Sequence, residues 1–140
     1  MTSALFLDRI VLVSKKALII TDGTISIQSI AQLIAGALSG FKVKICAASE
    51  FDGTDLLPAE VFFIGCENSA PPSFSYLEEM LSHINLASRK CGVFSVKEKP
   101  LKYLAKIIKD CEADTGEPLL APDGKINKTS LNKWLKKTLK

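Results

Sequence analysis

Three short apolar runs constrain this 140-residue chain more than any other feature of its sequence. They span residues 17–20, 61–66 and 91–96 and consist mainly of aliphatic and aromatic side chains. Runs of this length are typical of strands rather than of buried helices. Strands that are apolar along their whole length are buried on both faces, as in parallel sheets covered by helices. The sequence therefore predicts a parallel sheet enclosed between two layers of helices.

Amphipathic segments lie between these runs. Residues 26–38 carry apolar side chains at helical spacing and end before Gly40, which is a typical helix stop. Another helix is predicted from about Ser75, where Ser75 and Glu78 have the spacing of a capping box. Further helices are predicted over residues 99–111, with Pro100 in the first turn, and 130–139, and further strands over residues 41–49 and 116–122.

Strands and helices thus alternate along the chain, which predicts crossover connections between parallel strands. Five such strands suit a three-layer α/β sandwich, with a parallel sheet in the order 2-1-3-4-5. We expect a single domain over residues 1–140, with a core at 16–140 and an N-terminal extension at 1–15. The extension is predicted to add an edge strand that pairs between the subunits of a homodimer, or else to result from an upstream start.

Composition and cysteine content exclude several classes of function. The chain is 47% hydrophobic and 24% charged, as globular proteins are, and no apolar run reaches the length of a membrane span. Four cysteines without a Cys-x-x-Cys motif and a single histidine, His83, leave a metal site short of ligands. This cysteine usage indicates a reduced, cytoplasmic setting. Cys66, at a strand end, has no following Arg or His to lower its pKa, so buried packing is favoured over a reactive thiol.

The charge of the chain is unevenly distributed, although its net value is only +3. Residues 46–88 hold seven acids and no Lys or Arg, whereas residues 97–140 hold eleven lysines against six acids. This polarity predicts oriented docking to a protein partner or head-to-tail self-association. The lysines of the last helix lack the interleaved aromatic residues of nucleic-acid binding surfaces, so we expect neither nucleic acid nor a membrane as partner.

Several sequence landmarks follow one another along the chain. The strand KALII enters a Gly-Thr loop, and the helix SIAQLIAGALSG comes next. The strands FKVKICAAS, AEVFFIGC and KCGVFSV follow, and then a final helix that bears Trp134. In this order and spacing the chain resembles the flavodoxin family from about Lys16 to Leu139. The resemblance implies an open five-stranded parallel sheet, FMN at the ends of the first, third and fourth strands, and electron transfer.

The resemblance also implies which residues would hold FMN. The phosphate loop of the family has the pattern Ser/Thr-x-Thr-Gly-x-Thr and falls on residues 22–27. Gly23, Thr24 and Ser26 would contact the phosphate there. The loops after the third and fourth strands would surround the flavin ring, through Glu67, Asn68, Ser69, Lys97 and Glu98.

Three positions of the loop depart from the family pattern. Asp22 would set a carboxylate against a phosphate dianion, with a repulsion of roughly 4 kcal/mol per unit charge at about 4 Å and an effective dielectric constant of about 20. Ile25 stands where a glycine would let the backbone approach the phosphate. Ile27 removes a hydroxyl group. Asp22 is also expected to cap the turn or the helix through its own side chain.

These residues are compatible with two functions. One is a flavodoxin-like protein with a degraded FMN site that works as a non-flavin binding or interaction module. The alternative is an FMN-dependent electron-transfer protein. The predicted ring loops lack the aromatic faces that bind a flat ring, which favours the first function. No catalytic constellation is visible in the sequence, so enzymatic activity is not predicted.

Overall fold

The structure is a computed structural model that describes residues 15–140 of the chain. Its strands are β1 (Lys16–Thr21), β2 (Lys42–Ala47), β3 (Val61–Gly65), β4 (Lys90–Ser95), β5 (Asp114–Thr115) and β6 (Leu119–Leu120). All pair in parallel within one sheet, in which β1 lies between β2 and β3, and β4 follows β3. Both β5 and β6 pair with β4. The predicted order 2-1-3-4-5 is confirmed.

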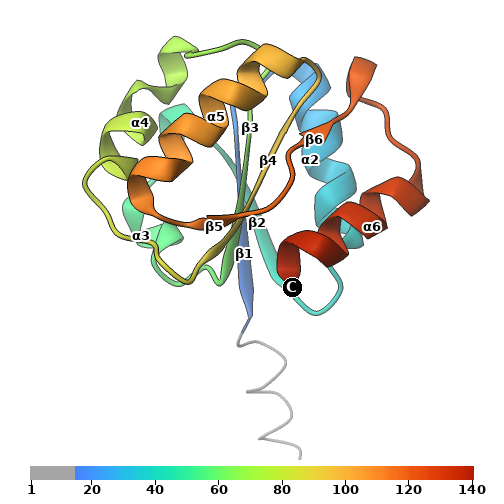
Figure 1. The fold of residues 1–140 in the computed structure, drawn as a ribbon, viewed down its shortest axis with the longest axis horizontal. Helices are drawn as coiled ribbons and strands as arrows, with labels where there is room; N and C mark the ends of the chain where they lie inside the picture. The colour runs from blue at the N-terminus through green and yellow to red at the C-terminus, as the bar shows by residue number, and fades with distance from the viewer. Residues whose placement is uncertain (1–14) are drawn as a thin grey trace, which may run out of the picture.

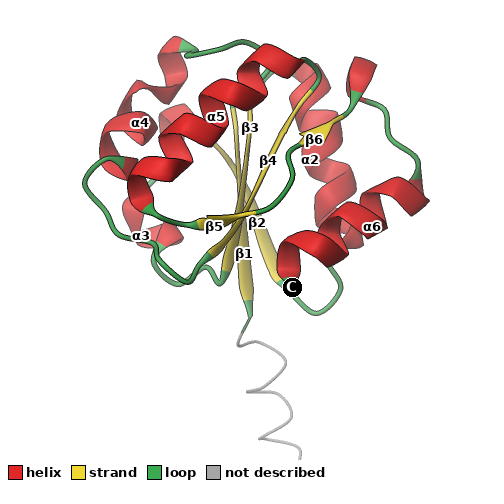
Figure 2. Cartoon of the chain, viewed as in Figure 1, coloured by secondary structure: helices red, strands yellow, loops and turns green. Residues whose placement is uncertain are grey.

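Helices cover both faces of this sheet, as Figures 1 and 2 show. They are α2 (Ile25–Ala37), α3 (Gly53–Leu56), α4 (Ser75–Leu81), α5 (Glu98–Cys111) and α6 (Lys128–Leu139). Helices α2 and α6 pack on one face, and α3, α4 and α5 pack on the other. Short 3₁₀ turns lie at Ala48–Glu50, Pro72–Phe74 and Pro122–Gly124. The predicted three-layer α/β sandwich is confirmed.

The central strands are buried along almost their whole length. Ile19 and Ile20 of β1 are fully buried, and so are Phe62 and Phe63 of β3. Because successive side chains of a strand point to opposite faces, each strand contributes to two cores. One core lies beneath α3, α4 and α5, and the other beneath α2 and α6. This burial on both faces explains why the apolar runs lack polar alternation.

Strand β2 forms an edge of the sheet and has a different pattern. Lys42 and Lys44 are exposed on it, whereas Val43 and Ile45 are half-buried. The strand predicted over residues 41–49 is confirmed, with its pairing limited to Lys42–Ala47. Its neighbour in the chain, α3, has only four residues and covers little of β2.

The predicted fifth strand over residues 116–122 is wrong in its extent. Only Leu119 and Leu120 pair there, as β6, while Asp114 and Thr115 form β5 ahead of them. Pro118 has no N–H group to donate to a neighbouring strand, so regular pairing is interrupted between the two short strands.

The capping box predicted at Ser75 and Glu78 is also wrong. The 3₁₀ turn Pro72–Phe74 runs directly into α4, so Ser75 already has helical backbone angles of φ −54° and ψ −48°. Phe74 occupies the N-cap position, and no side chain caps it. An N-cap residue precedes the first turn of its helix, whereas Ser75 already lies within that turn.

The N-terminal edge strand predicted from residues 1–14 lies outside the described residues. Within residues 15–140, no helix is both long and apolar enough to cross a membrane. In the same part of the chain, no group of three or more His, Cys, Asp or Glu side chains is placed to hold a metal ion.

Gly92 of β4 permits the contact between Phe63 and Trp134, whose ring centroids lie 5.7 Å apart. A Cβ atom at Gly92 would lie 2.7 Å from the Phe63 ring and 2.9 Å from the Trp134 ring. We therefore expect Gly92→Ala to lower the free energy of unfolding by about 1–3 kcal/mol through overpacking. Urea denaturation measures this change.

Gly36→Ala is the matched control for that substitution. Gly36 lies inside α2, and nothing approaches its Cβ position within 4 Å. Alanine has the higher helix propensity, so this variant should be more stable by up to about 1 kcal/mol. A Gly92→Ala variant as stable as the wild type would contradict the close packing around β4.

Candidate functional site

The loop between β1 and α2 is organised around the carboxylate of Asp22. Its Oδ1 atom accepts hydrogen bonds from the backbone N–H of Thr24 at 3.1 Å and from the Thr24 hydroxyl at 2.7 Å. Its Oδ2 atom accepts a hydrogen bond from the backbone N–H of Glu67 at 2.8 Å. The predicted capping of the turn by Asp22 is confirmed. The same carboxylate also ties the loop after β1 to the loop after β3.

A second link joins the same two loops. The Ser26 hydroxyl donates to Oε1 of Glu67 at 2.6 Å. Gly23 has a φ of +82°, which suits glycine, and its N–H donates to the Thr21 hydroxyl at 3.2 Å. Thr24 is the N-cap residue of α2, although its side chain does not cap the helix. The polar groups of the loop therefore bind mostly one another.

A cavity of about 370 Å³ opens at the carboxyl ends of the strands, beside these hydrogen bonds. It is lined by Ser26, Glu67, Val96, Lys97 and Asp123. Two carboxylates and one ammonium group give this lining a formal charge of −1. An anionic ligand would thus meet no net electrostatic attraction from the lining.

Several other predicted site residues lie around this region. Lys97 donates from Nζ to Oδ1 of Asn68 at 3.2 Å and so links the loops after β4 and β3. Ser69 and Glu98 are exposed, and neither side chain forms a hydrogen bond within residues 15–140. Ile25, the first residue of α2, is 88% exposed. Its side chain points into solvent rather than into the protein.

Ile27 has a different role from the one its place in the loop pattern suggests. Its side chain is fully buried in the core beneath α2 and α6. A hydroxyl at this position would face the sheet rather than a ligand at the strand ends. The lack of a hydroxyl at Ile27 therefore does not count against phosphate binding.

The turn after β6 completes the site, and the sequence pattern does not predict this. Asp123 has a φ of +61°, and a Cβ atom on Gly124 would lie 3.0 Å from the carbonyl oxygen of Ser26. Pro-Asp-Gly is a clear turn signal, but its spacing does not reveal that the turn contacts α2. Ser95 is also buried and donates to the Cys66 carbonyl oxygen at 2.6 Å, which joins the ends of β4 and β3.

Cys66 is fully buried at the end of β3. Burial raises the pKa of its thiol to about 12, with a smaller contribution from the charge of Asp22. A thiol with this pKa stays protonated at neutral pH and is a poor nucleophile. The prediction that Cys66 packs as a buried apolar residue is confirmed.

These contacts can be compared with the groups that FMN would need at this site. A phosphate binds through backbone N–H groups at a loop or helix terminus, and those of Thr24 and Glu67 are bonded to Asp22. No aromatic side chain lines the cavity formed by these described residues. The hydroxyl of Tyr103, on α5, is bonded to Glu78 at 2.9 Å. In this arrangement both backbone N–H groups are engaged, and the described lining of the cavity presents no aromatic face to a flat ring.

The strand order and the polar cavity at the strand ends define a doubly wound α/β protein. Among solved structures, the chain is similar to a short-chain flavodoxin associated with a PDU bacterial microcompartment, with a TM-score of 0.75 and 15% identity over 89% of this chain and 97% of that one. It is also similar to the Streptococcus pneumonia TIGR4 flavodoxin, with a TM-score of 0.71 and 17% identity over 88% and 93% of the two chains. Oxidised flavodoxin 2 from Bacillus cereus gives a TM-score of 0.66 and 20% identity over 89% and 95%.

The chain therefore has the flavodoxin-like fold. No protein-family model matches the sequence, and no curated protein does. The similarity is one of fold, because the sequence identities are low.

Asp22→Ala should lower the free energy of unfolding by about 2–3 kcal/mol, because it removes the acceptor of two backbone N–H groups and one hydroxyl. Asp52→Ala is the control, since Asp52 is exposed and accepts a hydrogen bond from the backbone N–H of Thr54 at 3.0 Å. It should cost about 1 kcal/mol. Urea denaturation compares the two, and an equal loss would contradict the central role of Asp22.

Proposed function

We propose that this flavodoxin-like protein does not hold FMN in the loop after β1 and works as a binding or interaction module. The observation that supports this proposal is the network around Asp22. One carboxylate accepts hydrogen bonds from Thr24 of the first loop and from Glu67 of the third-strand loop. A phosphate bound at the strand ends would need hydrogen-bond donors at these same positions.

The energetic argument concerns both hydrogen bonds and charge. A phosphate would have to displace the Asp22 carboxylate from two backbone N–H groups and then remain close to it. The displaced carboxylate would lose its charge-assisted hydrogen bonds, each of which contributes roughly 1.5–3 kcal/mol. Glu67 and Asp123 add two further negative charges to the cavity, against the single positive charge of Lys97. FMN binding would have to outweigh both the lost hydrogen bonds and the repulsion between the phosphate and these carboxylates.

The alternative function is FMN-dependent electron transfer. It is favoured by the cavity at the strand ends, by the left-handed Gly23, and by the flavodoxins among the structures with the same fold. Under this alternative, FMN would supply the redox chemistry. Gly23, Thr24 and Ser26 would hold its phosphate after the loop had rearranged around Asp22. The two functions therefore differ in whether this loop can accept a phosphate.

A titration of the purified protein with FMN, followed by quenching of flavin fluorescence, separates them. We expect no saturable quenching of FMN at micromolar wild-type protein. The Asp22→Ser/Glu67→Gln variant, which removes both carboxylates from the loop contact, should quench FMN more than the wild type does. Ile27 is kept in this variant, because its side chain belongs to the core.

Asp52→Ser/Glu60→Gln is the matched control, since it removes two exposed carboxylates away from the cavity. It should behave as the wild type does. Riboflavin, which lacks the phosphate, is titrated beside FMN to separate binding of the phosphate from binding of the ring. Submicromolar quenching of FMN by the wild type would overturn the proposal and support the electron carrier.

The uneven charge of the chain suggests where a protein partner would bind. Helix α4 carries Glu78 and Glu79, which border a shallow cavity with Asp110 of α5. Helix α6 lies on the other side of the molecule (Figure 1) and carries an exposed basic surface. This surface comprises Lys133, Lys136, Lys137 and Lys140, which border an open groove with Leu139. We propose that these surfaces orient a partner of complementary charge, and that two copies of the chain can use them head to tail.

Sedimentation velocity tests this second proposal. We expect weak self-association at about 0.02 M salt that disappears at about 0.3 M, because salt screens exposed charges. Lys136→Glu/Lys137→Glu should abolish the association at low salt. Lys102→Glu/Lys106→Glu, on α5, makes the same change in net charge away from α6 and should leave association in place. Self-association that does not respond to salt would contradict the proposal.

A further inference from the structure

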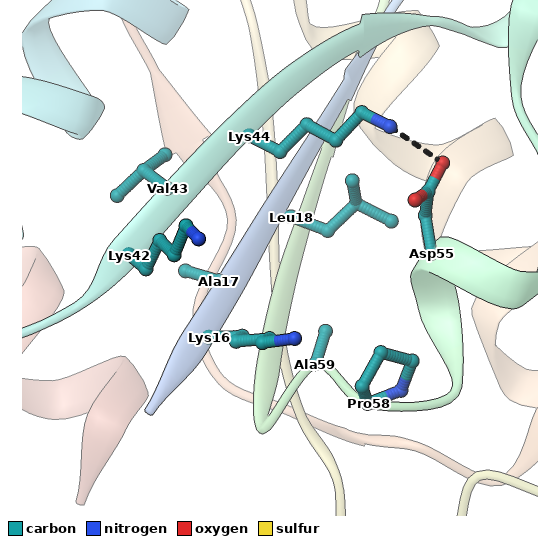
Figure 3. Close-up of a pocket in the computed structure, with 9 residues that line it drawn as sticks. All are labelled: Lys16, Ala17, Leu18, Lys42, Val43, Lys44, Asp55, Pro58 and Ala59. Carbon is teal, nitrogen blue, oxygen red and sulfur yellow. Dashed lines mark hydrogen bonds and ion pairs between the residues drawn. The ribbon is translucent and has the colours of Figure 1, made fainter. Parts of the chain in front are cut away.

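A second cavity, of about 160 Å³, lies at the opposite end of the strands from the site above (Figure 3). Lys16 and Lys42, the first residues of β1 and β2, flank it. We propose that this cavity binds a compact organic carboxylate, with its charged group between Lys16 and Lys42 and its apolar part against Pro58 and the apolar stems of these lysines. This inference does not depend on the function proposed for the loop after β1.

The cavity results from the shortness of α3. This helix ends after one turn, at Leu56, so the face of the sheet beneath β1 and β2 is left open near their starts. Pro58 and Ala59, which lead into β3, form the far wall, as Figure 3 shows. Ligands of doubly wound sheets usually bind at the carboxyl ends of the strands. A cavity at the amino ends therefore lies outside the usual position.

The charges around the cavity are incompletely paired. Lys16 and Lys42 are cross-strand partners in register, and their side chains share a face of the sheet. Like charges facing each other across two strands are unfavourable. Neither lysine forms an ion pair or a side-chain hydrogen bond within residues 15–140. Lys44, by contrast, is paired with Asp55 at 2.9 Å (Figure 3).

These charges favour an anion. Three ammonium groups and the carboxylate of Asp55 line the cavity, so the formal charge of the lining is +2. The pairing of Lys44 with Asp55 leaves Lys16 and Lys42 as the two available cations. A carboxylate between them would supply an opposite charge, and the apolar surface of Pro58 would favour a ligand with an apolar body over inorganic phosphate.

The floor of the cavity is apolar. Leu18, whose side chain points toward the space between the lysines and Asp55 (Figure 3), closes the base of the cavity together with Ala59. These two residues are only 2% and 1% exposed, so the apolar surface open to a ligand comes mainly from Pro58, which is exposed, and from the lysine stems. The volume is close to that of a protein cavity of about 150 Å³ that holds benzene. A ligand of this size would combine a carboxylate with an apolar body no larger than a single ring. Benzoate matches this description and serves as the probe.

The test is a titration with benzoate, followed by the backbone amide resonances of ¹⁵N-labelled protein. Benzamide, which has the same ring without the charge, and inorganic phosphate, which has charge without the ring, are titrated beside it. We expect saturable shifts at Leu18, Lys44 and Ala59 with benzoate, and binding of benzamide and phosphate at least about fivefold weaker. Benzoate binding should also weaken as the salt concentration rises.

Lys16→Gln/Lys42→Gln should weaken benzoate binding by about tenfold, because it removes both ammonium groups that flank the cavity. Lys136→Gln/Lys137→Gln removes the same charge from α6 and should leave the affinity unchanged. The amide spectra of both variants also report whether the fold is retained. Shifts that increase linearly without saturation, or affinity lost equally in both variants, would overturn the proposal. Phosphate binding as tight as benzoate would overturn it too.

Discussion

Burial of the central strands on both faces is the constraint on which the rest of this structure depends. Strands β1 and β3 expose almost no side chain, so they need a helical layer above and another below. Parallel strands in turn need crossover connections, and helices α2, α4 and α5 lie within these connections. The three layers and the position of the connecting loops at the strand ends follow from this requirement.

The same architecture brings the loops after β1, β3 and β4 to one edge of the sheet. In the doubly wound fold this edge is where a ligand usually binds. Here Asp22 bonds across the gap to the backbone of Glu67, and Ser26 bonds to the Glu67 side chain. Backbone N–H groups that could donate to a ligand donate instead to Asp22, which joins the two loops. These contacts thus contribute to the stability of a fold that flavodoxins share.

The two cavities at opposite ends of the strands differ in physical character. The cavity at the carboxyl ends is polar and carries a net negative charge, while its backbone donors are already engaged. The cavity at the amino ends has an apolar floor and two lysines without partners among the described residues. It exists because α3 stops after one turn and leaves the edge strand β2 partly uncovered. A small change in helix length thus opens a surface that a longer helix would cover.

The sequence by itself determined the fold class and most element positions, because apolar runs and helical periodicity report burial directly. The strand order was predicted from the number of strands and from the resemblance to flavodoxins. It also indicated the turn at Asp22, since an aspartate commonly accepts hydrogen bonds from the N–H two residues later. Only the tertiary structure decided that Asp22 reaches Glu67, that Asp123 joins the same cavity, and that Ile27 faces the core. It also decided that the fifth strand is split and that Lys16 and Lys42 face each other across two strands. These features join residues far apart in the chain, and their geometry depends on register and packing that no local pattern encodes.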